Sequence, residues 1–169
     1  ITDHLETVTE ILFSDYLNDA VFAPLGMTSS SLIGSGAKDV VSCVDDLVEF
    51  ALELRKPQLI SAETARIATT TQFADLEGVV PGVGRFSPCN WGYGPELHGA
   101  KHPHWMGTRN SASTFGHFGG SGTMMWIDPS INCGLIALTD RNFDEWSAEA
   151  LTSWPSLSDA VVRLVTNRA

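Results

Sequence analysis

The stretch FGHFGGSGTMMWIDPSINCGLIALTDR, residues 115–141, decides the fold of this chain. It alternates apolar segments with turn-forming residues. Asp-Pro-Ser-Ile-Asn at 128–132 separates the apolar segments 122–129 and 133–140, and a third segment at 111–118 precedes them. Short polar connections between apolar segments are typical of antiparallel hairpins. The stretch therefore predicts a three-stranded antiparallel meander.

An apolar sheet of this size needs a covering layer, and the end of the chain supplies one. Residues 157–167 have helical periodicity, which predicts an inner face made of Leu157, Val161, Leu164 and Val165. An amphipathic helix on an antiparallel sheet buries the apolar faces of both. Upstream, residues 76–101 are rich in glycine, proline and aromatic residues, which predicts short extended pieces with a strand at 89–97.

The N-terminal part carries helical patterns instead. Three segments have apolar residues at helical spacing and predict helices at 1–17, 42–56 and 61–72. In the second of these, Ser42 or Cys43 is predicted near the N-cap. Between the first two, Pro24 and Gly26 predict a turn through residues 21–31 that no helix crosses.

Together these patterns predict an α+β fold class, with an antiparallel β-sheet covered by the C-terminal helix and a separate helical region. The helical region is predicted at 1–75, and the strands and final helix at 76–169. With 169 residues, 43% hydrophobic and 18% charged, the chain has the composition of an ordinary globular domain.

Charge and cysteine content exclude several partners. Twenty acidic against 10 basic residues give a net charge of −10, without a Lys/Arg cluster, so nucleic-acid binding is not expected. Cys43, Cys89 and Cys133 are odd in number and widely spaced, which favours neither a disulfide framework nor a thiolate zinc site.

No apolar run approaches the roughly 18 residues that span a bilayer, so this chain is predicted to hold no membrane segment. The sequence specifies neither the compartment nor the oligomeric state.

A cluster of histidines makes a zinc site one alternative for the function of this chain. Four of the five, His98, His102, His104 and His117, fall within one third of the chain. The segment has neither a His-Glu-x-x-His motif nor paired thiolates, and Pro103 interrupts the strand that would place His102 beside His104. We therefore expect no metal and no cofactor.

The glycine cluster at 116–122 has several interpretations. A phosphate cradle would need a Gly-Lys-Ser/Thr sequence, which is absent. A nucleophile elbow at Ser121 would need glycine where Thr123 stands, and a helix after it. A glycine turn inside a hairpin is a purely structural alternative. The functional interpretation is a strand edge left open beside His117, able to pair with a peptide-like substrate and to aim an N–H at a developing oxyanion.

Five segments resemble, in order, those of the serine β-lactamase-like family, which includes class C β-lactamases, DD-peptidases and carboxylesterases. VFAPLGMTSSS is similar to the family's F-x-P-L-G-M segment. VVSCVDDLVEFALEL resembles its S-T-x-x-D-L-x-x-F helix, LISAETARIATTTQ its L-L-S-x-E-T segment and NWGYGPEL its G-Y-G strand. The stretch at 115–141 resembles the strand bearing H-x-G and the two strands after it.

The resemblance implies roles for individual residues. His117-Phe118-Gly119 takes the place of the family's K-T-G or H-x-G signature. His117 would organise substrate and the proton network, and the N–H of Gly120 would be one oxyanion-hole donor, with Gly119 beside them. The resemblance gives further substrate contacts at Phe118, Ser121, His104, Trp105 and Asn110.

The sequence departs from the family in one large respect. The family's S-x-x-K and Y-x-N motifs precede the P-L-G-M segment, and the only S-x-x-K here, Ser35 to Lys38, follows it and contains Gly36, which disfavours a helix. We therefore expect the chain to be the C-terminal portion of a longer serine hydrolase, inactive alone, whose parent acts on ester, amide or β-lactam carbonyls of small or peptide-like molecules. A non-catalytic peptide-binding or scaffold domain is the alternative.

Overall fold

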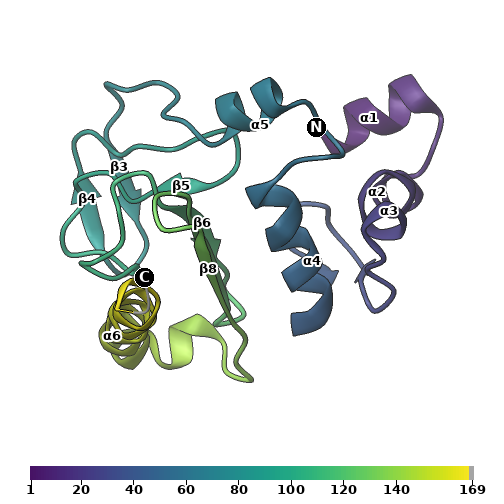
Figure 1. Ribbon diagram of the computed structural model, residues 1–169. Helices are drawn as coiled ribbons and strands as arrows, with labels where there is room; N and C mark the ends of the chain where they lie inside the picture. Colours follow the sequence, from purple (N-terminus) through teal and green to yellow (C-terminus); the bar gives the residue numbers. More distant parts are fainter. Residues whose placement is uncertain (168–169) are drawn as a thin grey trace. The chain divides into compact units, whose positions relative to one another are not determined.

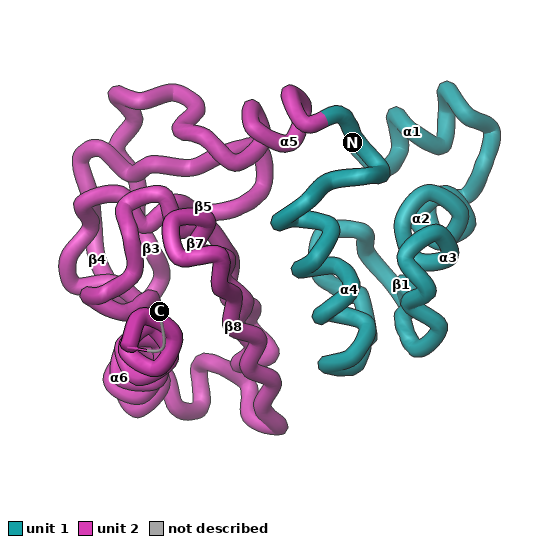
Figure 2. Tube along the Cα trace, in the orientation of Figure 1, with its two compact units in different colours: residues 1–61 teal, residues 62–169 magenta. Residues whose placement is uncertain are grey.

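The computed structural model describes residues 1–167, so the last two residues of the predicted 76–169 part lie outside the described residues. Internal contacts divide the chain into two compact units, residues 1–61 and 62–169 (Figure 2). Among the described residues no helix is both long and apolar enough to cross a membrane.

The first unit starts with helices that are shorter and more broken than the sequence predicts. α1 spans Thr2–Thr9 and ends where Glu10 adopts a left-handed conformation, with φ 56°. α2 (Phe13–Leu17) then runs directly into a π-helical turn (Asn18–Phe22) and into α3 (Ala23–Leu25). The prediction of one helix over 1–17 is therefore wrong.

Helical structure also continues where a turn was predicted. Pro24 lies in the first turn of α3, where its missing N–H removes no helical hydrogen bond. The helix ends only at Gly26, whose φ of 70° is a conformation that glycine adopts readily. The prediction that Gly26 ends a helix is therefore confirmed, and the prediction that Pro24 breaks one is wrong.

The rest of this unit is a small hairpin and a long helix. β1 (Ser31–Leu32) pairs antiparallel with β2 (Val40–Val41), and α4 spans Val44–Arg55 directly after its N-cap residue Cys43 (Figure 1). The helix predicted at 42–56 is confirmed. Asp46, buried in its first turn, accepts hydrogen bonds from the backbone N–H of Ser29 (2.8 Å) and the hydroxyl of Ser30 (2.7 Å).

The second unit begins with α5 (Ala62–Ala68), which is shorter than the predicted helix at 61–72. After the helix, the N–H of Gln72 donates to the carbonyl of Trp91 in an isolated antiparallel bridge. The hairpin of β3 (Gly78–Val80) and β4 (Gly84–Phe86) follows. The sequence predicts extended pieces in this region but not this pairing.

A four-stranded antiparallel sheet forms the centre of the second unit. Its strands lie in the order β5 (Glu96–Leu97), β6 (Phe115–Phe118), β7 (Met124–Asp128) and β8 (Cys133–Ala137). The three-stranded meander is confirmed as β6 to β8. The strand predicted at 89–97 is reduced to its last two residues, which extend the meander by one short strand.

A long C-terminal helix, α6 (Ser147–Thr166), lies against the sheet after the short 3-10 helix η2 (Phe143–Glu145), as Figure 1 shows. The covering helix is confirmed, but its predicted inner face is wrong in part, since Leu157 and Leu164 are 43% and 54% exposed. The helix begins ten residues earlier than predicted, and Trp154 enters the core. The buried positions recur at intervals of four: Ala150, Trp154, Ser158 and Val162.

Candidate active site

The site is centred on His117, the third residue of β6. Its side chain is exposed, while β6 neighbours Phe115 and Gly116 are buried. Side chains alternate along a strand, so Phe118 points to the opposite face. There its ring packs against Phe143, at 4.9 Å between centroids, and Trp154, at 5.7 Å. The imidazole thus lies on the face opposite α6, and Phe118 anchors the strand from the other face.

The open strand edge expected beside His117 exists, but only at one end of β6. β6 lies between β5 and β7 and is not an edge strand. β5 begins only at Glu96, opposite Gly116, so no strand lies beside Phe118 within residues 1–167.

The hydrogen-bond ladder shows which backbone groups are left open. The N–H of His98 donates to Thr114 and the N–H of Gly119 donates to Thr123, each at 2.8 Å, continuing the β5–β6 and β6–β7 registers. In an antiparallel ladder successive residues turn their backbone groups to opposite neighbours. The backbone groups of Phe118 therefore point toward the β5 side, beyond the end of that strand.

A tight glycine turn follows β6 and is fixed from several sides. The N–H of Gly122 donates to the carbonyl of Gly119 (3.0 Å), and the carbonyl of Gly120 accepts from the N–H of Phe143 (2.8 Å). Gly122 has φ 74°, and a Cβ there would lie 2.0 Å from the carbonyl oxygen of Arg141. Gly120 is an exposed residue, and its N–H donates to no group within residues 1–167. It is free to donate to a ligand.

The hydroxyl of Ser121 lies in the same turn. It is exposed and 3.1 Å from the hydroxyl of Thr123. No helix follows it, because the chain continues into β7. Ser121 therefore lies close to Gly120, without the geometry of a nucleophile elbow.

Trp91 contacts His117, and the sequence did not predict this contact. Its indole lies edge-on to the imidazole, with ring centroids 5.7 Å apart and planes at 66°. The residue is held by two antiparallel bridges, to Gln72 and to Glu96. The N-W-G-Y-G sequence contained a signal for a hairpin, but the contact joins residues 26 positions apart, so spacing could not reveal it.

A buried ionic network supports the hairpin of residues 90–97, which carries Trp91. The Glu96 carboxylate, 1% exposed, accepts hydrogen bonds from Lys101 (2.6 Å), His104 (3.0 Å) and the indole of Trp105 (2.7 Å). The Lys101 ammonium also donates to the carbonyl of Asn90, at 3.1 Å. One cation therefore joins both strands of the hairpin that carries Trp91.

Protonation in this network follows from its contacts. Burial raises the pKa of Glu96, but the hydrogen bonds from His104, Lys101 and Trp105 outweigh it, so the net pKa is lowered and the carboxylate is charged at neutral pH. Nδ1 of His104 accepts from the N–H of Met106 (3.2 Å), so Nε2 carries the proton donated to Glu96.

Three of the predicted substrate contacts lie inside the unit. His104 and Asn110 are each 6% exposed and Trp105 is fully buried, so these side chains do not reach the surface beside His117. His104 and Trp105 instead position Glu96, and Asn110 accepts from the N–H of Gly107 (2.9 Å). The structure brings together His117, Phe118, Gly119, Gly120 and Ser121, and not these three.

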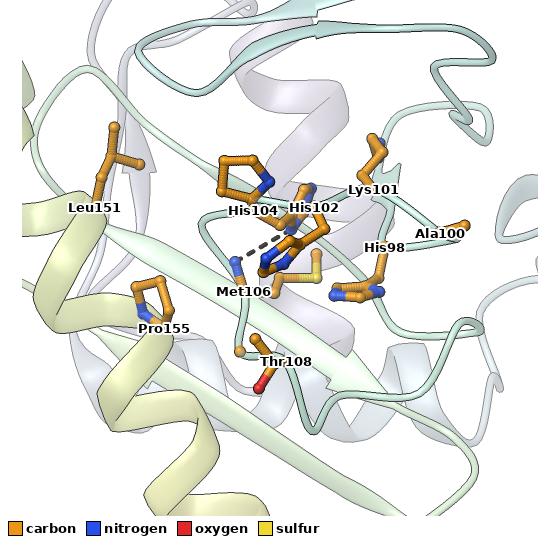
Figure 3. Close-up of a pocket in the computed structure, with 11 residues that line it drawn as sticks. His98, Ala100, Lys101, His102, His104, Met106, Thr108, Leu151 and Pro155 are labelled. Atoms are coloured by element: carbon orange, nitrogen blue, oxygen red, sulfur yellow. Dashed lines mark hydrogen bonds between the residues drawn. The ribbon is translucent and has the colours of Figure 1, made fainter.

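The remaining clustered histidines line a different pocket (Figure 3). It has a volume of about 340 Å³ and includes His98, His102 and His104, together with Leu151 and Pro155 of α6. Burial lowers the pKa of His98, whose Nδ1 lies 3.0 Å from the carbonyl of Gly99. No group of three potential ligands that could hold a metal is found among residues 1–167.

The formal S-x-x-K match lies outside any helix. Residues Ser35 to Lys38 form the turn between β1 and β2, and the Ser35 hydroxyl accepts from the N–H of Ala37 (3.3 Å). Serine and lysine therefore do not share a helical face, and the match is coincidental.

The α+β fold, the meander whose first strand carries His117, and the glycine turn after that strand are those of a class of proteins with the β-lactamase-like fold. The family description "Beta-lactamase" matches residues 1–154. The chain belongs to the beta-lactamase family. A search of curated proteins finds no match.

Solved structures agree with this assignment. A beta-lactamase (Mb2281c) from Mycobacterium bovis is 43% identical, with a TM-score of 0.92, over 98% of this chain and 61% of its own. The present chain thus spans less than two thirds of that protein. Simvastatin synthase (LovD) from Aspergillus terreus shares the fold, at 14% identity and a TM-score of 0.72 for the LovD9 mutant, over 98% of this chain and 53% of its own. The unliganded form gives 15% and 0.68, over 96% and 52%.

Proposed function

We propose that the protein containing these residues is a serine hydrolase that acts on ester, amide or β-lactam carbonyls through an acyl-enzyme, and that this chain forms one wall of its cleft. In this reaction a serine hydroxyl attacks the carbonyl, the leaving alcohol or amine departs with a proton, and water then hydrolyses the acyl ester.

One observation carries the proposal: an exposed imidazole and a free backbone N–H lie at the same end of one strand. The imidazole is that of His117, and the N–H is that of Gly120, three residues further on. An N–H in a fixed turn can stabilise the negative charge that develops on a carbonyl oxygen, since it needs no reorganisation when the charge appears. The open backbone of Phe118 between them can pair with an extended substrate.

The residues of the site have different proposed roles, which depend on where each lies in the strand or turn. His117 serves in proton transfer and in orienting the substrate, while Gly119 begins the tight turn that leads the chain into β7. Ser121 is placed to contact substrate through its exposed hydroxyl. Phe118 contributes its backbone to the substrate and its ring to the core.

The nucleophile is proposed to come from polypeptide other than these 169 residues. Ser35 lies in a turn and Ser121 lacks a partnering base, so neither is placed as an activated serine. The Mycobacterium bovis protein is longer, with 61% of its length matched. Residues 1–169 alone are therefore expected to be inert toward chromogenic esters and lactams.

A covalent probe tests the proposal. A fluorophosphonate should label the natural protein that contains these residues, and heat-denatured protein should not react. Absence of label on folded protein would overturn the proposal and favour the second candidate, a non-catalytic domain that binds peptides. That alternative is supported by the same open backbone at Phe118, which could accept an added strand without any chemistry.

A further inference from the structure

The structure assigns a binding subsite, next to Trp91, for an uncharged apolar group of an ester substrate; this inference rests on the proposed hydrolase function. The subsite is a pocket of about 320 Å³ whose lining includes Phe73, Leu76, Val79, Cys89 and Trp91. This volume is at the lower end of the range for small-molecule pockets, so it suits one substituent of a substrate and not a large ligand.

The rim of the pocket exposes large apolar side chains. Phe73, Leu76 and Val79 are 71%, 59% and 60% exposed, respectively. Single exposed apolar residues are ordinary on protein surfaces, whereas several gathered around one concavity are typical of a ligand site. An apolar group entering the pocket would be removed from water by contact with all three.

Phe73 adds an independent sign of function. Its φ of 54° is a left-handed conformation, which is unfavourable for a bulky side chain. The side chain is largely exposed, so no core packing compensates for the strain. Strained residues of this kind concentrate at ligand-binding sites, where the position of the side chain is what matters.

Close packing requires glycine at two positions in the pocket wall. Gly78 lines it, and a Cβ at this position would lie 2.8 Å from the Cβ of Cys89. Gly92 also lines it, and a Cβ there would lie 2.1 Å from the carbonyl oxygen of Ala68. A side chain at either position would displace these neighbours, so the two glycines help to fix the shape of this wall.

The pocket adjoins the candidate active site through one side chain. Trp91 lines the pocket, and the same indole contacts the imidazole of His117 with centroids 5.7 Å apart. A substrate whose carbonyl lies beside His117 therefore needs to extend past only one aromatic ring to reach the pocket. The indole would then contact both the reacting end and the apolar end of the substrate.

Charge selects against carboxylates at this position. Glu77 is the one ionisable carboxylate or ammonium group that lines the pocket, and its carboxylate lies 3.1 Å from Arg85. The described lining residues therefore offer no unpaired cation to a substrate carboxylate at this end, whereas an uncharged alkyl or aryl group needs none. Neutral esters are therefore favoured over substrates with an acidic group at this position.

Two ester series test the subsite on the natural protein that contains these residues. One lengthens the acyl group of p-nitrophenyl esters from acetate to butyrate, and the other lengthens the alcohol of acetate esters from methyl to butyl. If one end enters the pocket, kcat/KM should rise about fourfold per added CH₂ in that series, the factor for burying one methylene group. Leu76→Ser and Val79→Ser should flatten that dependence, because both side chains are exposed and can be replaced without unfolding the protein. Leu164→Ser, an equally exposed leucine on α6, is the matched control and should leave it unchanged.

The outcomes separate the two proposals. Turnover of the acetate esters with no dependence on chain length in either series, or a dependence that Leu76→Ser and Val79→Ser leave intact, would overturn the subsite and leave the hydrolase function standing. No turnover of any ester and no fluorophosphonate labelling would overturn both. A carboxylated ester that reacts faster than its neutral counterpart, and more slowly in Glu77→Gln, would contradict the charge argument.

Discussion

The imidazole of His117 lies edge-on to the indole of Trp91, with ring centroids 5.7 Å apart, on the exposed face of the sheet. Phe118, the next residue, packs on the other face against Phe143, at 4.9 Å. Phe118 thus anchors the strand from the other face, while Trp91 orients the exposed imidazole without burying it.

Replacing His117 should reduce activity without affecting stability. In the whole protein, His117→Ala should lower kcat/KM for a reactive ester by about 10² to 10⁴, the usual contribution of a group that transfers protons. Its unfolding free energy should change by less than about 0.5 kcal/mol because the side chain is exposed. His102→Ala, at another exposed histidine, should leave both quantities unchanged, and an equal loss of activity in that variant would contradict the role of His117.

Gly120 offers a test of the backbone donor. Gly120→Pro removes the N–H and should lower kcat by about 10² to 10³. Gly120→Ala retains the N–H, and its Cβ would meet no atom within 4 Å, so it should retain most activity. Thermal melting of both variants separates folding from catalysis. Similar activity in the two variants would show that this N–H has no part in the reaction.

The ionic network of Glu96 predicts a large effect on stability. Lys101→Met leaves a buried carboxylate without its cation and should cost about 3 to 5 kcal/mol of unfolding free energy. Glu96→Gln in the same chain removes the uncompensated charge and should restore part of the loss. The exposed pair of Glu63 and Arg66 is the control, since Glu63→Gln should leave the melting temperature unchanged. Additive losses in the double variant would rule out a coupled pair.

Two pH windows of stability should be separable by chemical denaturation. Burial lowers the pKa of His98 in the folded state, so the unfolded state binds protons first as pH falls below about 6.5, and stability decreases there. The folded-state pKa of Glu96 is also lowered, so its contribution is present above about pH 4.3 and is lost as pH falls through the folded-state pKa. His98→Gln should reduce the first loss and keep the second. If the variant lost as much stability between pH 6.5 and 5 as the unmodified protein does, the assignment would be contradicted.

The sequence predicted elements whose signals are local. The turn at 128–132 and the glycines after His117 were sufficient for the meander, because short connections permit only adjacent antiparallel strands. α4 was equally clear from its apolar spacing and its acidic first turn. Helix boundaries were less predictable, since the π-helical turn at Asn18–Phe22 carries the chain into α3 past the expected break.

The site was predictable only in part, for physical reasons. His117 stands out as a polar residue in an apolar strand, and Gly120 as part of the glycine turn directly after that strand. Trp91 reaches His117 only through a sheet contact across 26 residues. Trp105 was expected at the surface, but its indole donates to Glu96 in the interior. A polar amino-acid composition does not distinguish a surface loop from a buried loop whose side chains hydrogen-bond one another.

The central claim is that the N–H of Gly120 receives the oxyanion while a serine from other polypeptide attacks. The most direct measurement is a crystal structure of the whole protein after reaction with a fluorophosphonate. We predict one modified serine outside these 169 residues, with the phosphonyl oxygen 2.7 to 3.1 Å from the nitrogen of Gly120, roughly the distance of an oxyanion-hole contact, and His117 facing the adduct. Modification of Ser35 or Ser121, or an adduct remote from Gly120, would contradict the account.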